Sequence, residues 1–143
     1  MIDLSRTALV ITVLGLGLFA GALTFLKRTQ RFDSFRSRSC QGRLWRRRFA
    51  TASKDDLRAF LQVFVKAFAI NPRLRLHFHP DDRVLDIYRA LNPPDWSRAD
   101  AMELELYELN FHKAYGIRLG TVWHEKMTLG ELFQLTLAKP MGA

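Results

Sequence analysis

Helix start and stop signals most constrain what this chain can fold into, because they divide residues 51–143 into short helical lengths. Ser53 followed by Asp56 is an N-cap pattern. Apolar residues recur behind it at helical spacing, namely Leu57, Phe60, Leu61, Phe64 and Phe68. Asn71-Pro72 ends this first helix. The pattern predicts a helix that buries one aromatic-rich face.

Three further helices are predicted by the same kind of signal. One opens at Pro80-Asp81-Asp82 and stops at Asn92-Pro93-Pro94, with Val84, Leu85, Tyr88 and Leu91 facing inward. The next is capped by Ser97 and closed by Gly116. In the last, Thr128 and Glu131 form a capping box ahead of Leu129, Leu132, Phe133 and Leu137. Together the four helices predict a small all-α bundle of residues 51–143, large enough to fold alone.

One stretch departs from the helical period. The sequence "RLRLHFHP" at 73–80 alternates apolar and polar residues, which predicts an extended segment with Leu74, Leu76 and Phe78 on one side. The segment is too short and too isolated to indicate a sheet. His77 and His79 fall on its polar side, with Asp81 and Asp82 after them. No third ligand stands at a motif spacing, so we predict no metal site.

Residues 8–26, "ALVITVLGLGLFAGALTFL", carry no charge over 19 positions. At about 1.5 Å rise per residue, such a helix approaches the ~30 Å hydrocarbon thickness of a bilayer. A cleaved signal peptide is the alternative, with Ala20-Gly21-Ala22 as its small-residue site. The run is longer than the usual ~7–15 residues of such peptides, and cations follow it at once. We therefore predict that residues 1–26 are a transmembrane anchor of a single-pass membrane protein whose C-terminal domain is cytoplasmic.

Residues 27–50 hold the basic excess of a chain whose net charge is +8, because cations and anions balance in the rest of the sequence. Aromatic residues interleave with their cations, a composition that suits anionic lipid headgroups. The expected headgroup contacts are Lys27, Arg28, Arg31, Arg46, Arg47 and Arg48. A merely solvated juxtamembrane linker is the alternative, and nucleic acid is disfavoured because no nucleic-acid-binding motif is present. The lone Cys40 excludes an internal disulfide and is read as a free thiol, with lipid attachment as the lesser alternative.

The helix expected within "ADAMELELYELNFHKAYGIRL" has two apolar faces. At about 100° per residue, one face holds Leu104, Tyr107, Phe111, Ala114 and Tyr115, and it is the expected core side. Met102, Leu106 and Leu109 fall on the opposite side, with Glu103, Glu105 and Glu108 as acidic neighbours. This second stripe is either a surface for a protein partner or core beneath the preceding loop. We favour the partner surface.

Three motifs in this region resemble an acyl carrier protein. They are "DAME" at 100–103, "YGI" at 115–117 and "TLGEL" at 128–132, in the family's order, and the resemblance covers residues 53–139. It implies a four-helix carrier fold in which a serine at a helix start bears 4′-phosphopantetheine. The matching position here is Ala101, which has no hydroxyl to modify. Ser97 is the nearest upstream hydroxyl and is the alternative attachment site.

Motifs for catalysis are missing from the sequence: it has no phosphate-binding loop and no nucleophile elbow. We therefore expect no enzyme, cofactor or metal. The predicted function is a membrane-anchored docking module that recruits a protein able to recognise carriers. The alternatives are a true carrier loaded at Ser97, and a passive helical domain whose Arg-rich segment binds anionic lipid.

Overall fold

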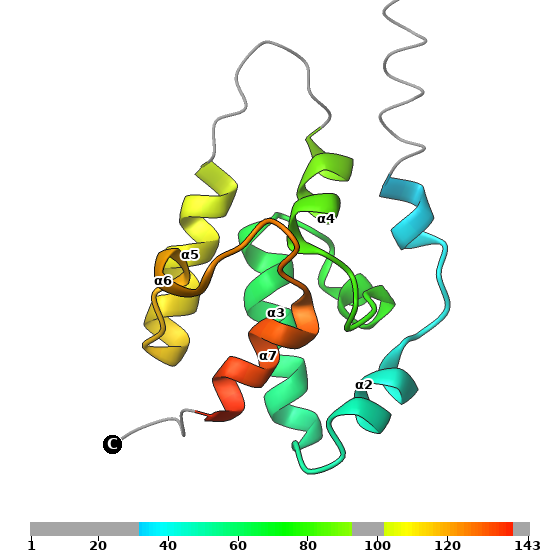
Figure 1. The fold of residues 1–143 in the computed structure, drawn as a ribbon. Helices are drawn as coiled ribbons and strands as arrows, with labels where there is room; N and C mark the ends of the chain where they lie inside the picture. The colour runs from blue at the N-terminus through cyan, green and yellow to red at the C-terminus, as the bar shows by residue number, and fades with distance from the viewer. Residues whose placement is uncertain (1–31, 93–101, 139–143) are drawn as a thin grey trace, which may run out of the picture.

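The computed structural model describes residues 32–92 and 102–138, and these residues form a helical domain (Figure 1). Residues 32–36 are helical. The other elements are α2 (Gly42–Arg48), α3 (Lys54–Ala67), the 3-10 helix η1 (Pro72–His77), α4 (Val84–Leu91), α5 (Met102–Tyr115), α6 (Leu119–Val122) and α7 (Leu129–Ala138). The described residues contain no strand; Arg83 and Thr128 form an isolated antiparallel bridge.

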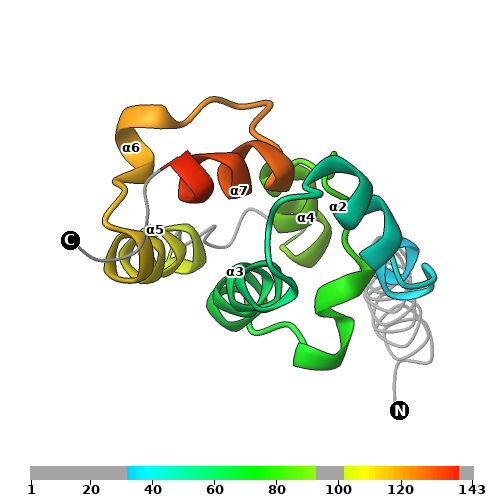
Figure 2. The same cartoon turned by 90° about the horizontal axis from the view of Figure 1, so that it is seen from below.

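Helix α3 lies in the middle of the domain, with α5 on one side and α2 on the other (Figures 1 and 2). The Ser53 hydroxyl accepts a hydrogen bond from the Asp56 amide at 3.0 Å, which confirms the predicted N-cap. Phe60, Leu61 and Phe64 of this helix have no exposed surface. The inward face predicted from their spacing is therefore the centre of the core.

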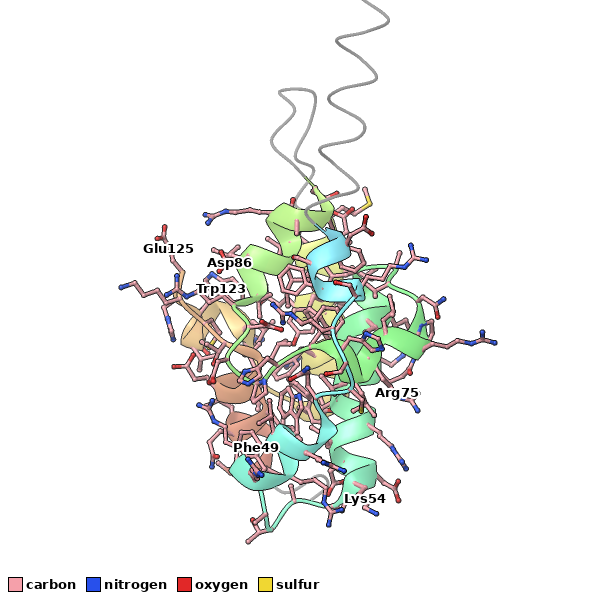
Figure 3. The ribbon with its side chains drawn as sticks, turned by 90° about the vertical axis from the view of Figure 1, so that its right-hand side faces the viewer. Phe49, Lys54, Arg75, Asp86, Trp123 and Glu125 are labelled. Carbon is pink, nitrogen blue, oxygen red and sulfur yellow. The ribbon has the colours of Figure 1, made fainter. Side chains whose placement is uncertain are left out.

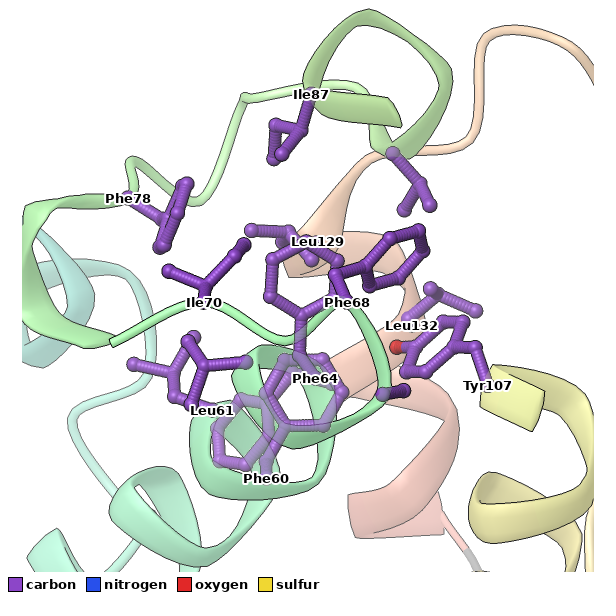
Figure 4. Packing of buried hydrophobic residues seen from close by; sticks show 14 of the residues in the cluster. Phe60, Leu61, Phe64, Phe68, Ile70, Phe78, Ile87, Tyr107, Leu129 and Leu132 are labelled. Atoms are coloured by element: carbon purple, nitrogen blue, oxygen red, sulfur yellow. The ribbon is translucent and has the colours of Figure 1, made fainter. Parts of the chain in front are cut away.

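The core around α3 is built largely from aromatic rings (Figure 4). The ring of Phe60 lies 5.1 Å from that of Phe133 on α7, and the ring of Phe64 meets Tyr107 on α5 edge-on at 5.5 Å. Offset and edge-on pairs of this kind are the favoured aromatic geometries. They hold α5 and α7 against the same central helix.

Residues 32–50 belong to this core, in contrast to the predicted linker 27–50 and the predicted domain start at residue 51. Trp45 of α2 is fully buried, and its indole N–H donates to the Phe78 carbonyl oxygen at 2.8 Å. Phe35 and Phe49 are also buried. The Gln41 amide donates to the Leu76 carbonyl at 2.7 Å. The arginines next to these aromatic residues on α2 are exposed, so the segment is amphipathic. Its basic composition alone did not indicate this.

The predicted extended segment at 73–80 is instead mostly the 3-10 helix η1. Pro72 stands in its first turn, and the Asn71 side chain accepts from the Arg73 amide at 3.0 Å. These local signals favour a helical turn. Phe78 nevertheless points inward and is fully buried, because the chain becomes extended at that residue.

The starts of α4 and α7 are joined by backbone hydrogen bonds. The Leu129 amide donates to the Asp82 carbonyl at 3.0 Å, and the Gly130 amide donates to the Pro80 carbonyl at 2.7 Å. The predicted capping box is confirmed, since the Glu131 amide donates to the Thr128 hydroxyl at 3.2 Å and the Glu131 carboxylate accepts from the Thr128 amide at 2.8 Å. A Cβ on Gly130 would lie 2.9 Å from the Pro80 carbonyl oxygen, so this approach requires glycine.

Across residues 32–92 and 102–138, no helix combines the length and the apolar character that crossing a membrane demands. This finding corrects the predicted architecture of a transmembrane helix followed by a four-helix bundle, and with it the predicted single-pass membrane localisation. The apolar stretch 8–26, on which both predictions were based, lies outside the described residues.

Candidate docking surface on helix α5

The inner face of α5 fixes the helix to the core. Tyr107 and Phe111 have no exposed surface, and Phe111 meets Phe60 of α3 edge-on at 6.3 Å. Gly116 ends the helix with a φ of 65°, a left-handed conformation that glycine adopts without steric cost. The structure therefore confirms the predicted core side and the predicted end of this helix.

The outer face of α5 carries the large apolar side chains that are exposed in the described part of the chain. Met102 is 66% exposed, Leu109 is 64% exposed and Leu106 is 42% exposed. Single exposed leucines are ordinary on protein surfaces, whereas a contiguous apolar stripe is the kind of surface that interaction sites use. The stripe is therefore not core beneath the preceding loop, and its role in docking stays a prediction.

The acidic residues beside the stripe are of two kinds. Glu105 is exposed and Glu103 is partly buried, and neither forms an ion pair with another described residue. Glu108, by contrast, accepts a hydrogen bond from the Gly120 amide at 3.3 Å. It thereby satisfies an N–H in the first turn of α6. Glu108 thus contributes to the fold, while Glu103 and Glu105 remain available to a partner.

The first and last turns of α5 differ in charge. Glu103 and Glu105 lie in the first turn, and His112 and Lys113 lie in the last turn, where both side chains are exposed. This order matches the helix dipole, which favours anionic groups at the start and cationic groups at the end. The outer face is consequently apolar along its middle and of opposite charge at its two ends.

Ser97 and Ala101, the residues on which the carrier comparison depends, lie outside the described residues. The loss of the phosphopantetheine site at Ala101, and the alternative attachment at Ser97, stay predictions.

The cations predicted to contact lipid headgroups do not form one set. Lys27, Arg28 and Arg31 lie outside the described residues. Arg46 and Arg47 are exposed on α2, whereas Arg48 pairs with Asp81. The guanidinium of Arg48 also lies 5.8 Å from the centre of the Phe49 ring. The arginine segment thus includes a side chain that stabilises the fold. In Figure 3, Phe49 lies directly after the end of α2, and the side chain of Lys54 extends outward from the domain.

The two histidines that were weighed as metal ligands form local contacts. The His77 ring Nδ1 lies 3.0 Å from the Arg36 carbonyl oxygen, and the His79 ring accepts from the Asp81 amide at 3.0 Å. Within the described residues there is no group of three or more side chains that could hold a metal ion.

Both tyrosines of α5 have raised pKa values. Burial raises the pKa of Tyr107 far above its usual value, with a smaller contribution from Tyr115. Burial, together with the charge of Asp56, raises the pKa of Tyr115 to about 12. Both hydroxyls therefore stay protonated at neutral pH. The Tyr107 hydroxyl has no hydrogen-bond partner among the described residues.

An open cavity of about 380 Å³, which no motif in the sequence predicts, lies between the end of α2 and α7. The Glu131 carboxylate at its edge is held by Thr128, whose backbone N–H lowers the pKa of Glu131. Both groups are thereby used in capping α7. The cavity is lined by Arg48, Phe49, Val122, His124, Met127, Gly130, Glu131, Gln134 and Leu135.

Comparison with known proteins adds no assignment, because no family model, no curated protein and no solved structure matches this chain.

Proposed function

We propose that this chain is a non-catalytic docking module that binds another protein chain through the outer face of α5. The observation that carries the proposal is the exposure of Met102, Leu106 and Leu109 in one stripe on a helix that is fixed to the core from its other side by the buried Tyr107 and Phe111. A helix held in this way presents its outer face in a fixed orientation. Little conformational freedom is then lost when a partner binds.

The apolar stripe is large enough to contribute to binding. Full burial of a leucine or methionine side chain is worth about 1.5–3 kcal/mol. Because the three side chains are 42–66% exposed, covering them would yield about half of the full value each, or roughly 2–5 kcal/mol together. Losses of motion on association offset part of this energy. The expected affinity is therefore modest.

The carboxylates of Glu103 and Glu105, which pair with no other described residue, indicate the chemistry of the partner. It needs an apolar strip to cover the leucines and cationic groups to face the two glutamates, since complementary charge sets the register of an interface. The resemblance to acyl carriers implies the same kind of surface, an apolar stripe with acidic neighbours, for recruiting a carrier-recognising protein.

Site-specific photocross-linking in cells that produce the full chain tests the proposal. A photoreactive phenylalanine analogue at position 109 is expected to cross-link to a protein chain, while the same analogue at Lys66, an exposed residue of α3, is not. Equal labelling at both positions, or none at 109, would overturn docking through α5.

The variants Leu109→Glu and Met102→Glu provide the matching loss of function. Both side chains are mostly exposed, so neither variant should change the circular-dichroism melt, whereas each should abolish the cross-link formed from a neighbouring outer-face position. A lowered melting temperature would place these side chains in the core and contradict the proposal.

A further inference from the structure

The outer face of α5 has the spacing of a short coiled-coil stripe. Met102, Leu106, Leu109 and Lys113 follow one another at intervals of four, three and four residues, as the two inward positions of a heptad do. The buried residues Tyr107 and Phe111 fall at heptad positions that face away from such a stripe. One helix therefore satisfies the core of its own domain and still offers a complete seam to a second helix.

The charges along this seam distinguish between the two directions in which a second helix could lie. Glu103 and Glu105 occupy the first turn of α5, and His112 and Lys113 occupy the last turn. A parallel copy of α5 would set the glutamates of the two helices beside each other. An antiparallel copy would set the glutamates of each helix beside Lys113 of the other. The charge pattern of α5 is therefore complementary to that of a second α5 that runs in the opposite direction.

We propose that the partner of the α5 surface is a second copy of this chain, docked antiparallel across a two-fold axis. This inference rests on the proposed docking function and names the partner for the same site. Leu106 of each copy packs against Leu109 of the other, because these two residues are placed symmetrically about the middle of the seam. Met102 covers the aliphatic stem of Lys113 from the other copy, which leaves that ammonium group beside Glu103.

The symmetry of the seam favours this occupant over a different protein. In a two-fold dimer each surface must complement itself, and the order of acidic, apolar and basic residues along α5 does so without any added residue. A lysine at one seam position also fixes the register and direction of pairing at a cost in stability. The single helix pair is smaller than the ~1,200–2,000 Å² of a stable interface, so the expected dimer is weak.

Disulfide trapping between two full-length variants tests both the partner and the direction. The exposed Cys40 is first replaced by serine in both chains. A chain with Leu106→Cys is then mixed with a tagged chain carrying Leu109→Cys under mild oxidation. The mixed pair should cross-link at least about tenfold faster than either same-residue pair, because only the mixed pair brings the two Cβ atoms within disulfide distance.

Controls separate this geometry from unspecific association. Arg73→Cys on η1 is exposed and distant in sequence from the seam, and it should cross-link with neither seam variant above background. Faster same-residue pairs would indicate a parallel arrangement and overturn the antiparallel one. Equal rates for all pairs, including position 73, would overturn specific self-docking.

A charge reversal supplies a second test that leaves the apolar seam intact. Lys113→Glu places a carboxylate beside Glu103 of the other copy and should slow mixed cross-linking about 2- to 25-fold, since an exposed ion pair changes an equilibrium by about 1.4- to 5-fold and occurs twice in the dimer. Adding Glu103→Lys to the same chain should restore the rate. A double variant as slow as the single one would contradict the antiparallel pairing.

The two proposals fail in different ways. If the seam cysteines do not pair above the control while photocross-linking from position 109 captures a different protein, self-docking is wrong and docking through α5 stands. If position 109 captures no chain at all, docking through α5 fails, and self-docking fails with it.

Discussion

Replacement of Trp45 by alanine should destabilise the domain severely, although the residue stands in an arginine-rich stretch. The side chain has no exposed surface and its ring lies 5.8 Å from the rings of both Phe49 and Phe133. Its indole N–H donates to the Phe78 carbonyl at 2.8 Å. Loss of a buried tryptophan to alanine costs about 3–5 kcal/mol. A buried carbonyl left without a donor costs about 1–3 kcal/mol.

The expected loss for Trp45→Ala is therefore about 4–8 kcal/mol, comparable to the whole stability of a marginal domain, which is about 5–15 kcal/mol. Trp45→Phe keeps most of the apolar contact and loses the hydrogen bond, so about 1–3 kcal/mol is expected. Urea unfolding of the full chain, followed by far-ultraviolet circular dichroism, measures both values. This signal does not depend on the tryptophan that is removed.

The neighbouring Arg46→Ala is the matched control for these variants. Its side chain is exposed on the same helix, so its unfolding free energy should stay within about 0.5 kcal/mol of the parent. A loss below about 1 kcal/mol for Trp45→Ala, with an unchanged slope against urea, would show that α2 is not part of the cooperative unit. The assignment of residues 32–50 to the folded domain would then be refuted.

Three further predictions concern single contacts. Gly130→Ala should cost about 1–3 kcal/mol in urea unfolding, because its Cβ would lie 2.9 Å from the Pro80 carbonyl oxygen; an unchanged midpoint would contradict that approach. Tyr107→Phe should leave the domain equally stable or raise its melting temperature, since the buried hydroxyl has no partner among the described residues; a clear loss would reveal a hydrogen bond to that oxygen. The lowered pKa of Glu131 means that its contribution is present above the unfolded-state pKa and is lost as pH falls through the lower folded-state pKa. Glu131→Gln should therefore flatten the fall in stability as pH drops below the unfolded-state pKa, and an unaltered acid profile would count against the carboxylate's role in the capping box.

Helix boundaries set by adjacent residues could be predicted from the sequence. Ser53 with Asp56, and Thr128 with Glu131, each close a hydrogen-bonded cap within four residues of chain. Gly116 likewise ends α5 by its own conformational freedom. Such signals depend on neighbours in sequence, so the tertiary structure does not need to be known.

Elements that depend on distant partners could not be predicted in the same way. Trp45 is followed directly by three arginines, and only its contact with Phe78, 33 residues away, shows that it points inward. The 3-10 helix η1 was missed because alternation of apolar residues was given more weight than the cap at Asn71 and the proline after it. The ion pair of Arg48 could not be predicted either, because its partner Asp81 lies in a distant segment of the chain.

For the second apolar stripe of α5, the sequence left two possibilities, a surface for a partner or core beneath the preceding loop. Periodicity alone separated Met102, Leu106 and Leu109 from the core face, but it left open whether another part of the chain covers them. Their exposure decides between the two. The use of Glu108 in capping α6 could not be predicted, because it depends on where Gly120 returns to α5.

The hydrogen bonds between the starts of α4 and α7 have a consequence for how the chain can vary in length. Val84 donates to the Met127 carbonyl at 3.0 Å, so the chain leaves this junction at residue 84 and returns to it at residue 127. Within that excursion, α5 packs on α3 and α6 packs on α5. A single residue added between Pro80 and Val84 would therefore break the register in which the Pro80 and Asp82 carbonyl groups accept from the Gly130 and Leu129 amides, so the length of this short connection is fixed by a segment far along the chain.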